Sequence, residues 1–174
     1  MLDLNRIPEV WIRTSARVAA GSCAMATLTH IATYGTPDLA DQVQGVTFAL
    51  FPLTFLVLGA AILVIALCSV SLGRLFGMLP LHVKVLGVIA AAYIFVDFFW
   101  VIHLLPGQPI EQDGRFFFDD HGRLIPISSQ TYRLSLLFQA RLFSGHEIIL
   151  TGVAAILGYQ LDRLRRGQLT APSQ

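Results

Sequence analysis

Long apolar blocks separated by short polar connections dominate the pattern along this chain. Residues 45–73 and 85–96 contain no Asp, Glu, Lys or Arg, and residues 146–161 contain one acid, near their start. A helix needs about 20 predominantly apolar residues to cross the hydrocarbon of a bilayer. The pattern therefore predicts three membrane-spanning helices, near residues 45–72, 84–105 and 146–164.

A fourth apolar block, residues 18–34, also lacks acids, Lys and Arg, but it is shorter and rich in Ala, Ser and Thr. We interpret it as a further span, near residues 14–34, because an odd number of spans would spoil the charge pattern described below. Ala16, Ala20 and Ala24 follow a spacing that lets helix backbones approach closely. The sequence thus predicts an all-α membrane protein, a single domain over residues 1–174 with four transmembrane helices.

The segment between the third and fourth spans, residues 106–145, is the sizeable stretch expected outside the membrane. Residues 115–118 and 123–127, joined by a turn that ends at Gly122, predict a β-hairpin. Ser128 or Ser129 is suited to cap a following helix whose mixture of Leu, Phe and Arg favours the membrane interface. Ser144 and Gly145 then permit a bend into the last span. We therefore expect an extracytoplasmic β-hairpin and an interfacial helix between helices 3 and 4.

Composition supports a membrane protein and excludes one class of partner. Hydrophobic residues make up 55% and charged residues 13% of the chain, whereas roughly a quarter of the residues of a soluble domain are charged. The formal net charge is +1, without the clustered basic stripe that is typical of nucleic-acid-binding proteins. The expected partners are the lipid bilayer and either another membrane protein or further copies of this chain.

The distribution of basic residues favours one orientation in the membrane. Eight lie near the amino terminus, between the second and third spans, and after the fourth: Arg6, Arg13, Arg17, Arg74, Lys84, Arg163, Arg165 and Arg166. Because cytoplasmic loops carry an excess of Lys and Arg, we expect a multi-pass protein of the cell membrane with both termini in the cytoplasm. The four arginines of the external segment run against this pattern.

Three histidines are expected at one depth, just beneath the outer surface. His30 lies near the outer end of the first span, His103 near that of the third, and His146 starts the fourth beside Glu147; His121 in the hairpin turn could fold over them. Imidazole and carboxylate groups are ligands of Zn²⁺, Fe and Cu, and two axial histidines can hold a haem. A metal ion or haem is therefore one hypothesis. The alternative is that each histidine forms a hydrogen bond between packed helices.

Asp97 interrupts the aromatic and aliphatic residues of the third span. A charged carboxylate at such depth costs roughly 2.5–3.5 kcal/mol on the insertion scale, so it should be partnered, hydrated or protonated. Tyr93 lies four residues earlier on the same helix face, and His30 could reach this site from the first span. Asp97 and Tyr93 are therefore candidates for a proton relay or a ligand site. The alternative is an Asp–His or Asp–Tyr pair that fixes how the helices pack.

No Gly-rich phosphate loop, G-x-S-x-G elbow or H-E-x-x-H motif is present. The chain does contain an HG dipeptide at His121, then Tyr132, and then the run Arg141-Leu142-Phe143-Ser144-Gly145-His146. This arrangement resembles small uncharacterised bacterial membrane proteins, in which an HG turn precedes a helix that ends in R-x-F-S-G-H at the start of a span. The resemblance implies a bacterial inner-membrane protein without implying an activity. It draws attention to Arg141, Ser144 and His146 as a unit.

Three functional hypotheses follow, and the sequence leaves open whether the protein is an enzyme. The first is a non-catalytic accessory or partner-binding subunit, whose apolar strand at residues 116–118 would be covered by a partner. The second is a redox protein that binds a metal or haem through the histidines. The third is a proton-coupled carrier centred on Asp97, although the chain lacks the internal repeats that are common in transporters.

Overall fold

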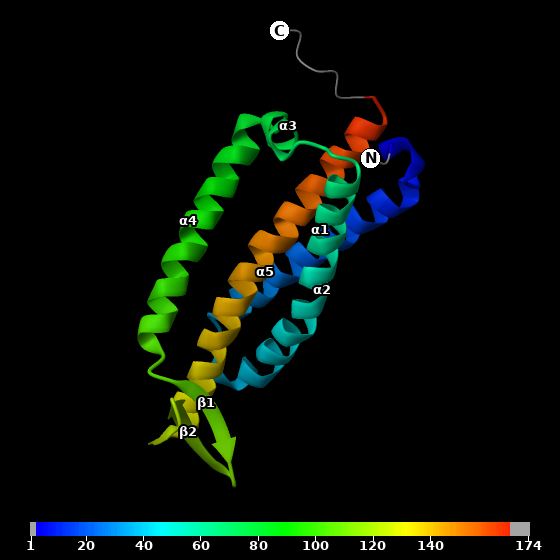
Figure 1. Cartoon of the computed structure of the whole chain (residues 1–174). Coiled ribbons are helices and arrows are strands. Elements are labelled where there is room, and N and C mark those ends of the chain that lie inside the picture. Colours follow the sequence, from blue (N-terminus) through cyan, green and yellow to red (C-terminus); the bar gives the residue numbers. More distant parts are fainter. Residues whose placement is uncertain (1–2, 168–174) are drawn as a thin grey trace.

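The computed structural model describes residues 3–167 and is mostly helical, with one small antiparallel sheet. Its elements, in chain order, are a 3-10 helix at Leu4–Arg6, α1 (Glu9–Ala32), a 3-10 helix at Pro37–Leu39, α2 (Ala40–Leu67), α3 (Leu72–Gly77), α4 (Leu81–Leu104), β1 (Gln108–Gln112), β2 (Arg115–Asp120), β3 (Arg123–Ile127) and α5 (Ser129–Arg165). Figure 1 shows the four long helices side by side, with the sheet at one end.

Three of the long helices are long and apolar enough to cross a membrane: Pro37–Leu67, Leu81–Leu104 and Ser129–Arg165. They correspond to the second, third and fourth predicted spans. The first predicted span forms α1, which has 24 residues but is not among the helices of residues 3–167 that meet both criteria. Glu9, Arg13 and Arg17 lie in its first half, and small polar residues dilute the rest. The structure thus supports a helical membrane protein with three candidate spans.

Helix α5 is the central element, because α1 and α2 both pack along it while α4 lies to one side (Figure 1). Small residues allow the close contact between α1 and α5. A Cβ atom added to Gly158 would lie 2.9 Å from the Cβ of Ala16. On the same α1 face Ala19 and Ala26 are buried, whereas Ala20 is exposed. Of the predicted Ala16, Ala20 and Ala24 face, Ala16 makes the close contact, whereas Ala20 and Ala24 are exposed and the packed face continues through Ala19 and Ala26 instead.

The interfacial helix and the bend at Ser144 and Gly145 were wrong predictions, because α5 runs without a break from Ser129 to Arg165. The two small residues serve packing instead. A Cβ on Gly145 would lie 3.1 Å from Cδ1 of Ile94 in α4, so only glycine admits that helix without displacement. The Ser144 hydroxyl donates to the Arg141 carbonyl of its own helix at 3.2 Å. The segment between α4 and α5 therefore ends at Ser128, not at residue 145.

The predicted hairpin is confirmed as β2 and β3, which pair antiparallel. At their turn His121 and Gly122 have φ values of 55° and 90°, as a type I′ turn requires. Ser128 caps α5, since its hydroxyl oxygen accepts a hydrogen bond from the Thr131 amide at 3.1 Å. These features were all readable from the sequence.

A third strand, β1, was not predicted. It pairs antiparallel with β2 through a turn at Asp113 and Gly114, whose φ values are 52° and 71°. Asp-Gly is among the strongest hairpin signals, so this turn could have been recognised. The sheet order is β1-β2-β3.

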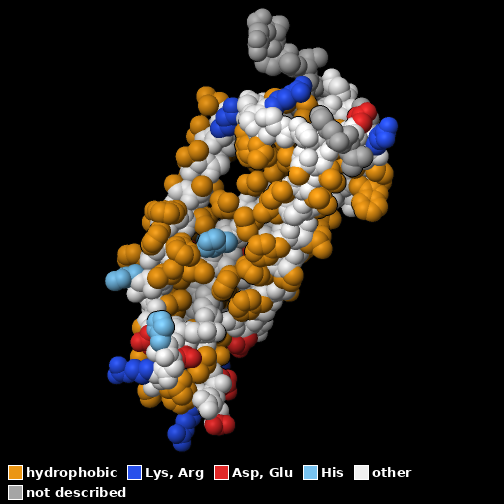
Figure 2. Space-filling view, viewed as in Figure 1, with side chains coloured by type: hydrophobic (Ala, Val, Ile, Leu, Met, Phe, Trp, Pro, Cys, Tyr) orange, Lys and Arg blue, Asp and Glu red, His pale blue; other side chains and the backbone are white. Residues whose placement is uncertain are grey.

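Charged side chains gather at the two ends of the molecule, and hydrophobic side chains cover the middle of the face seen in Figure 2. At the end opposite the sheet, Arg13 on α1 pairs with Asp162 on α5 at 3.3 Å. Glu9 pairs there with Arg165 at 3.6 Å and Arg166 at 3.8 Å. This arrangement, with ionic ends and an apolar middle, suits a helix bundle that crosses a bilayer.

Candidate functional site

His30 lies where α1, α4 and α5 meet, and both of its ring nitrogens are engaged. Nδ1 lies 3.0 Å from the Ser144 hydroxyl of α5, and Nε2 lies 2.9 Å from the Tyr93 hydroxyl of α4. The helix interface at Gly145 makes this possible, because it brings α4 against α5 beside the imidazole. A single buried imidazole therefore links three helices.

The hydrogen-bonded chain continues from His30 toward the surface. The Tyr93 hydroxyl lies 2.6 Å from the hydroxyl of Tyr34, which is 57% exposed. Above the Tyr34 ring sits the Arg141 guanidinium, 3.8 Å from the ring centroid. Arg141 also donates to the Thr33 hydroxyl at 3.2 Å and to the Thr33 carbonyl at 3.1 Å. The arginine thus holds the outer end of the chain in place.

Each member of this chain can both donate and accept a hydrogen bond. In one orientation Tyr34 donates to Tyr93, Tyr93 to His30 Nε2, and His30 Nδ1 to Ser144, whose hydroxyl donates to a backbone carbonyl. In the other orientation every bond between the four side chains is reversed. We call Tyr34, Tyr93, His30 and Ser144 the hydrogen-bonded chain. Such an arrangement can pass a proton from one end to the other.

Glu147 lies one helical turn beyond Ser144 on α5 and is fully buried, with an exposure of 0%. Neither of its carboxyl oxygens has a hydrogen-bond partner. An unpartnered buried carboxylate is costly, and a bound proton or ligand would remove much of that cost. The sequence predicted that Glu147 lies at the start of the last span, but α5 begins at Ser129 and Glu147 lies well inside this helix.

The surroundings of Glu147 can be inferred from the packing of α2 on α5. Ala140 packs in one buried cluster with Val43, and Ala154 in another with Val57. Val43 and Ala140 are as far apart in the sequence as Val57 and Ala154, so α2 and α5 run parallel. Leu50 and Glu147 have the same separation in sequence, and they therefore lie at the same level along the two helices.

Buried threonines flank that level. Their hydroxyls donate to carbonyls of their own helices: Thr47 to Val43, Thr54 to Leu50, and Thr151 to Glu147. The hydroxyl groups of these threonines are thus already engaged in hydrogen bonds within their own helices. The Glu147 carboxyl group is left without the donors that would stabilise its charge.

Asp97 is buried on α4, one turn beyond Tyr93, with 9% of its surface exposed. The hydrogen bond from α4 to His30 comes, however, from the Tyr93 hydroxyl. Tyr93 and His30 of the predicted group are therefore in contact, whereas Asp97 forms no hydrogen bond with either of them within residues 3–167.

The five residues predicted as metal ligands are not gathered at one point. His103 and His146 are exposed, and the His146 ring lies against Phe98 while its Nδ1 donates to the Leu142 carbonyl at 2.7 Å. His121 bonds Asp120 at 2.8 Å in the hairpin turn, and this carboxylate raises the pKa of His121. Within residues 3–167 no three His, Cys, Asp or Glu side chains are placed to hold a metal ion.

The motif unit Arg141, Ser144 and His146 is divided between two surfaces. Arg141 and Ser144 contact α1, whereas His146 is exposed. Sequence reasoning did not identify Tyr34 or Thr33. The four-residue spacing from His30 to Tyr34, which matches that from Tyr93 to Asp97, was the available signal, because residues four apart share a helix face.

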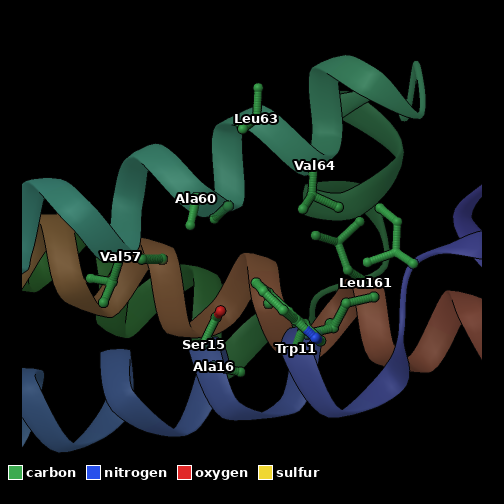
Figure 3. Close-up of a pocket in the computed structure, with 13 residues that line it drawn as sticks. Trp11, Ser15, Ala16, Val57, Ala60, Leu63, Val64 and Leu161 are labelled. Carbon is green, nitrogen blue, oxygen red and sulfur yellow. The ribbon is translucent and has the colours of Figure 1, made fainter. Parts of the chain in front are cut away.

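A separate pocket of about 220 Å³ lies between α1, α2 and α5, toward the end opposite the sheet. Figure 3 shows Trp11, Ser15 and Ala16 from α1 facing Ala60 and Val64 of α2. Its lining is apolar apart from the Ser15 hydroxyl and the Trp11 indole nitrogen. The pocket can accommodate an apolar group, and its lining contains no reactive side chain.

Comparisons with protein-family models, with curated proteins and with solved structures found no match to this chain. The assignment of a function therefore rests on its own side chains. Among these, the hydrogen-bonded chain and the buried Glu147 form the site with the clearest chemical capacity.

Proposed function

We propose that this membrane protein transfers protons between the surface at the sheet end and Glu147 in its core, as part of proton-coupled transport. The observation that carries the proposal is the hydrogen-bonded chain, which runs from exposed Tyr34 to buried Ser144 without a missing link. The unpartnered Glu147 carboxyl group lies one turn further along α5. Donor, relay and acceptor are thus arranged in order.

The transfer balances at each step. A proton from water reaches the Tyr34 hydroxyl as this group gives its own proton to Tyr93. Tyr93 passes a proton to Nε2 of His30, whose Nδ1 releases one to Ser144. The last transfer, from Ser144 to Glu147 three residues on, requires the Ser144 hydroxyl to turn from the Arg141 carbonyl and the Glu147 side chain to rotate toward it, because the two groups are not hydrogen-bonded in the structure. After the transfer every hydrogen bond of the hydrogen-bonded chain points in the reverse direction. Rotation of the hydroxyl groups and a change of tautomer in the imidazole restore the first orientation.

The other two hypotheses have less support. The accessory hypothesis relied on an uncovered strand at residues 116–118, but Phe118 is buried and Phe116 stacks on Tyr132 of α5 with ring centroids 4.6 Å apart. The chain thus covers that strand itself. The metal hypothesis needs ligands that converge, and the histidines of residues 3–167 lie on different surfaces.

Time-resolved infrared spectroscopy after a pH jump tests the relay. We expect the purified protein to show a carboxylic-acid band from Glu147 that is absent in Glu147→Gln and present in the exposed control Glu111→Gln. The rate at which the Glu147 band changes after the pH jump should fall on the order of tenfold or more in His30→Gln and Tyr93→Phe, as expected when one acid–base step is removed. His103→Gln and Tyr132→Phe are the matched controls. Unchanged rates in both relay variants would refute the proposal.

Transport across the membrane is tested in liposomes that enclose a pH-sensitive dye. When Glu147 also releases its proton toward the end opposite the sheet, a potassium diffusion potential, negative inside, should acidify vesicles that contain the wild-type protein faster than protein-free vesicles. Glu147→Gln should remove the difference and Glu111→Gln should retain it. Equal acidification by wild type and Glu147→Gln would show that protons cross by another route.

A further inference from the structure

A second site lies between α4 and the α1–α5 pair, at the end of the bundle opposite the sheet. Two adjoining hollows of about 570 Å³ and 510 Å³ share Leu79, Val83 and Ile156 in their walls, so they form one groove. Figure 2 shows the molecule hollowed in this region. The groove exists because α4 meets α5 closely at Ile94 and Gly145, nearer the sheet, and diverges from there.

The two parts of the groove differ in chemistry. The larger part is lined mainly by aliphatic residues, with Phe76, Cys23, Lys84 and two glycines, Gly87 of α4 and Gly152 of α5. The smaller part is lined in addition by Arg17 of α1 and Arg163 of α5. The apolar part of the groove therefore leads into a cationic part.

The charges in the smaller part are uncompensated. Within residues 3–167, Arg13, Arg165 and Arg166 form ion pairs with Glu9 and Asp162 on the other side of the bundle end. Arg17 and Arg163 form no ion pair with the described part of the chain. Two free guanidinium groups beside an apolar groove favour an amphipathic anion.

A buried polar atom gives an independent indication of a ligand. Gln160 lines the same cationic part of the groove and is 1% exposed, yet its Oε1 has no hydrogen-bond partner. An acceptor left unpaired in a buried position costs free energy unless a donor reaches it. A hydroxyl group on the bound molecule would supply that donor.

We propose that this groove binds one anionic phospholipid. An acyl chain lies along Gly87 and Gly152, the phosphate contacts Arg17 and Arg163, and a headgroup hydroxyl donates to Gln160. Lys84, which donates to the Gly77 carbonyl at 3.1 Å, borders the chain-binding part. The site does not depend on the proposed proton transfer.

Native mass spectrometry of the detergent-purified protein with phosphatidylglycerol and phosphatidylcholine of equal chain length tests the proposal. The wild type should prefer phosphatidylglycerol on the order of tenfold, since each cation near a lipid surface contributes about 1 kcal/mol. The double variant Arg17→Gln, Arg163→Gln should lose that preference. Arg115→Gln, Arg123→Gln, which removes two charges at the sheet end, should retain it.

A second variant tests the apolar part. A Cβ on Gly87 has no atom within 4 Å, so Gly87→Leu fills the groove without opposing the fold. It should reduce retention of both lipids severalfold while the protein remains monodisperse. Equal binding of the two lipids by the wild type, or a preference that survives loss of Arg17 and Arg163, would overturn the proposal. So would a change of oligomeric state in Gly87→Leu, which would identify the groove as a contact between copies.

Discussion

At the scale of single residues, His30 and Glu147 are buried ionisable groups in opposite situations. His30 has a partner for each ring nitrogen, whereas Glu147 has none for either oxygen. Burial without a partner is rarely retained for stability, because an apolar side chain of similar size would pack at lower cost. Glu147 is therefore a residue whose presence calls for a functional explanation.

Replacement of Glu147 by Met should stabilise the protein. The change keeps the length of the side chain and removes two unsatisfied oxygens, so we expect a gain of about 1–3 kcal/mol. Thermal unfolding in detergent measures it, with Glu111→Met on the exposed strand β1 as the control. A loss of stability of the same size would mean that the carboxyl group has a stabilising contact in the membrane.

The exposed pair of His121 and Asp120 gives a pH-dependent prediction. The hydrogen bond to the Asp120 carboxylate raises the pKa of His121 above 6.5. Protonated His121 is thus favoured in the folded hairpin. The pair therefore contributes to the stability of the fold below pH 6.5, and this contribution is lost as the pH rises through the raised pKa of His121. NMR titration of His121 should show a downward shift of its pKa in Asp120→Asn. Asp113→Asn, in the other hairpin turn, should leave that pKa unchanged.

At the scale of elements, the length of the apolar blocks was sufficient to predict α2 and α4, and turn chemistry was sufficient to predict β2, β3 and the cap at Ser128. The sequence pattern was insufficient to predict the structure at Ser144 and Gly145, because small residues are typical both of helix bends and of close contacts between helices. A sequence alone does not show which neighbour, here Ile94, lies opposite a glycine. The same limit applies to the histidines, since depth along a helix leaves the direction of the side chain open.

The role of Gly145 as a contact point between α4 and α5 can be tested directly. Gly145→Val places methyl groups against Ile94, whose nearest atom would lie 3.1 Å from the new Cβ. We expect a loss of stability of about 1–3 kcal/mol from overpacking, together with faster amide hydrogen exchange in α4. Gly152→Ala, whose Cβ would meet Cys23 at an ordinary 3.6 Å, should change neither property. Equal effects of the two substitutions would contradict this role.

At the scale of the whole molecule, the described parts of the two ends of the chain are tied together. Glu9 at the start of α1 pairs with Arg165 and Arg166 at the end of α5, and the sheet lies at the opposite end of the bundle (Figure 1). A chain that crosses the membrane in this arrangement has its α1 start and α5 end on one side. From the excess of basic residues at that end, we predict that this side faces the cytoplasm.

Reporter fusions test this orientation. A fluorescent protein attached after residue 167 should be active in the cytoplasm, as should one attached before α1. An alkaline phosphatase inserted at the β1–β2 turn, after Asp113, should be active outside. Phosphatase activity from a fusion at either end would contradict the proposed topology.

The continuity of α5 has a consequence for how the protein responds to its bilayer. At 37 residues this helix is about 55 Å long, well beyond a hydrocarbon core of about 30 Å. A thinner bilayer is matched by greater tilt of a long helix. Because α5 leads directly from the sheet, and residues 105–107 join the sheet to α4, any tilt swings the sheet and displaces the adjoining end of α4. We therefore expect membrane thickness to influence the position of α4, the helix that carries Tyr93 and Asp97.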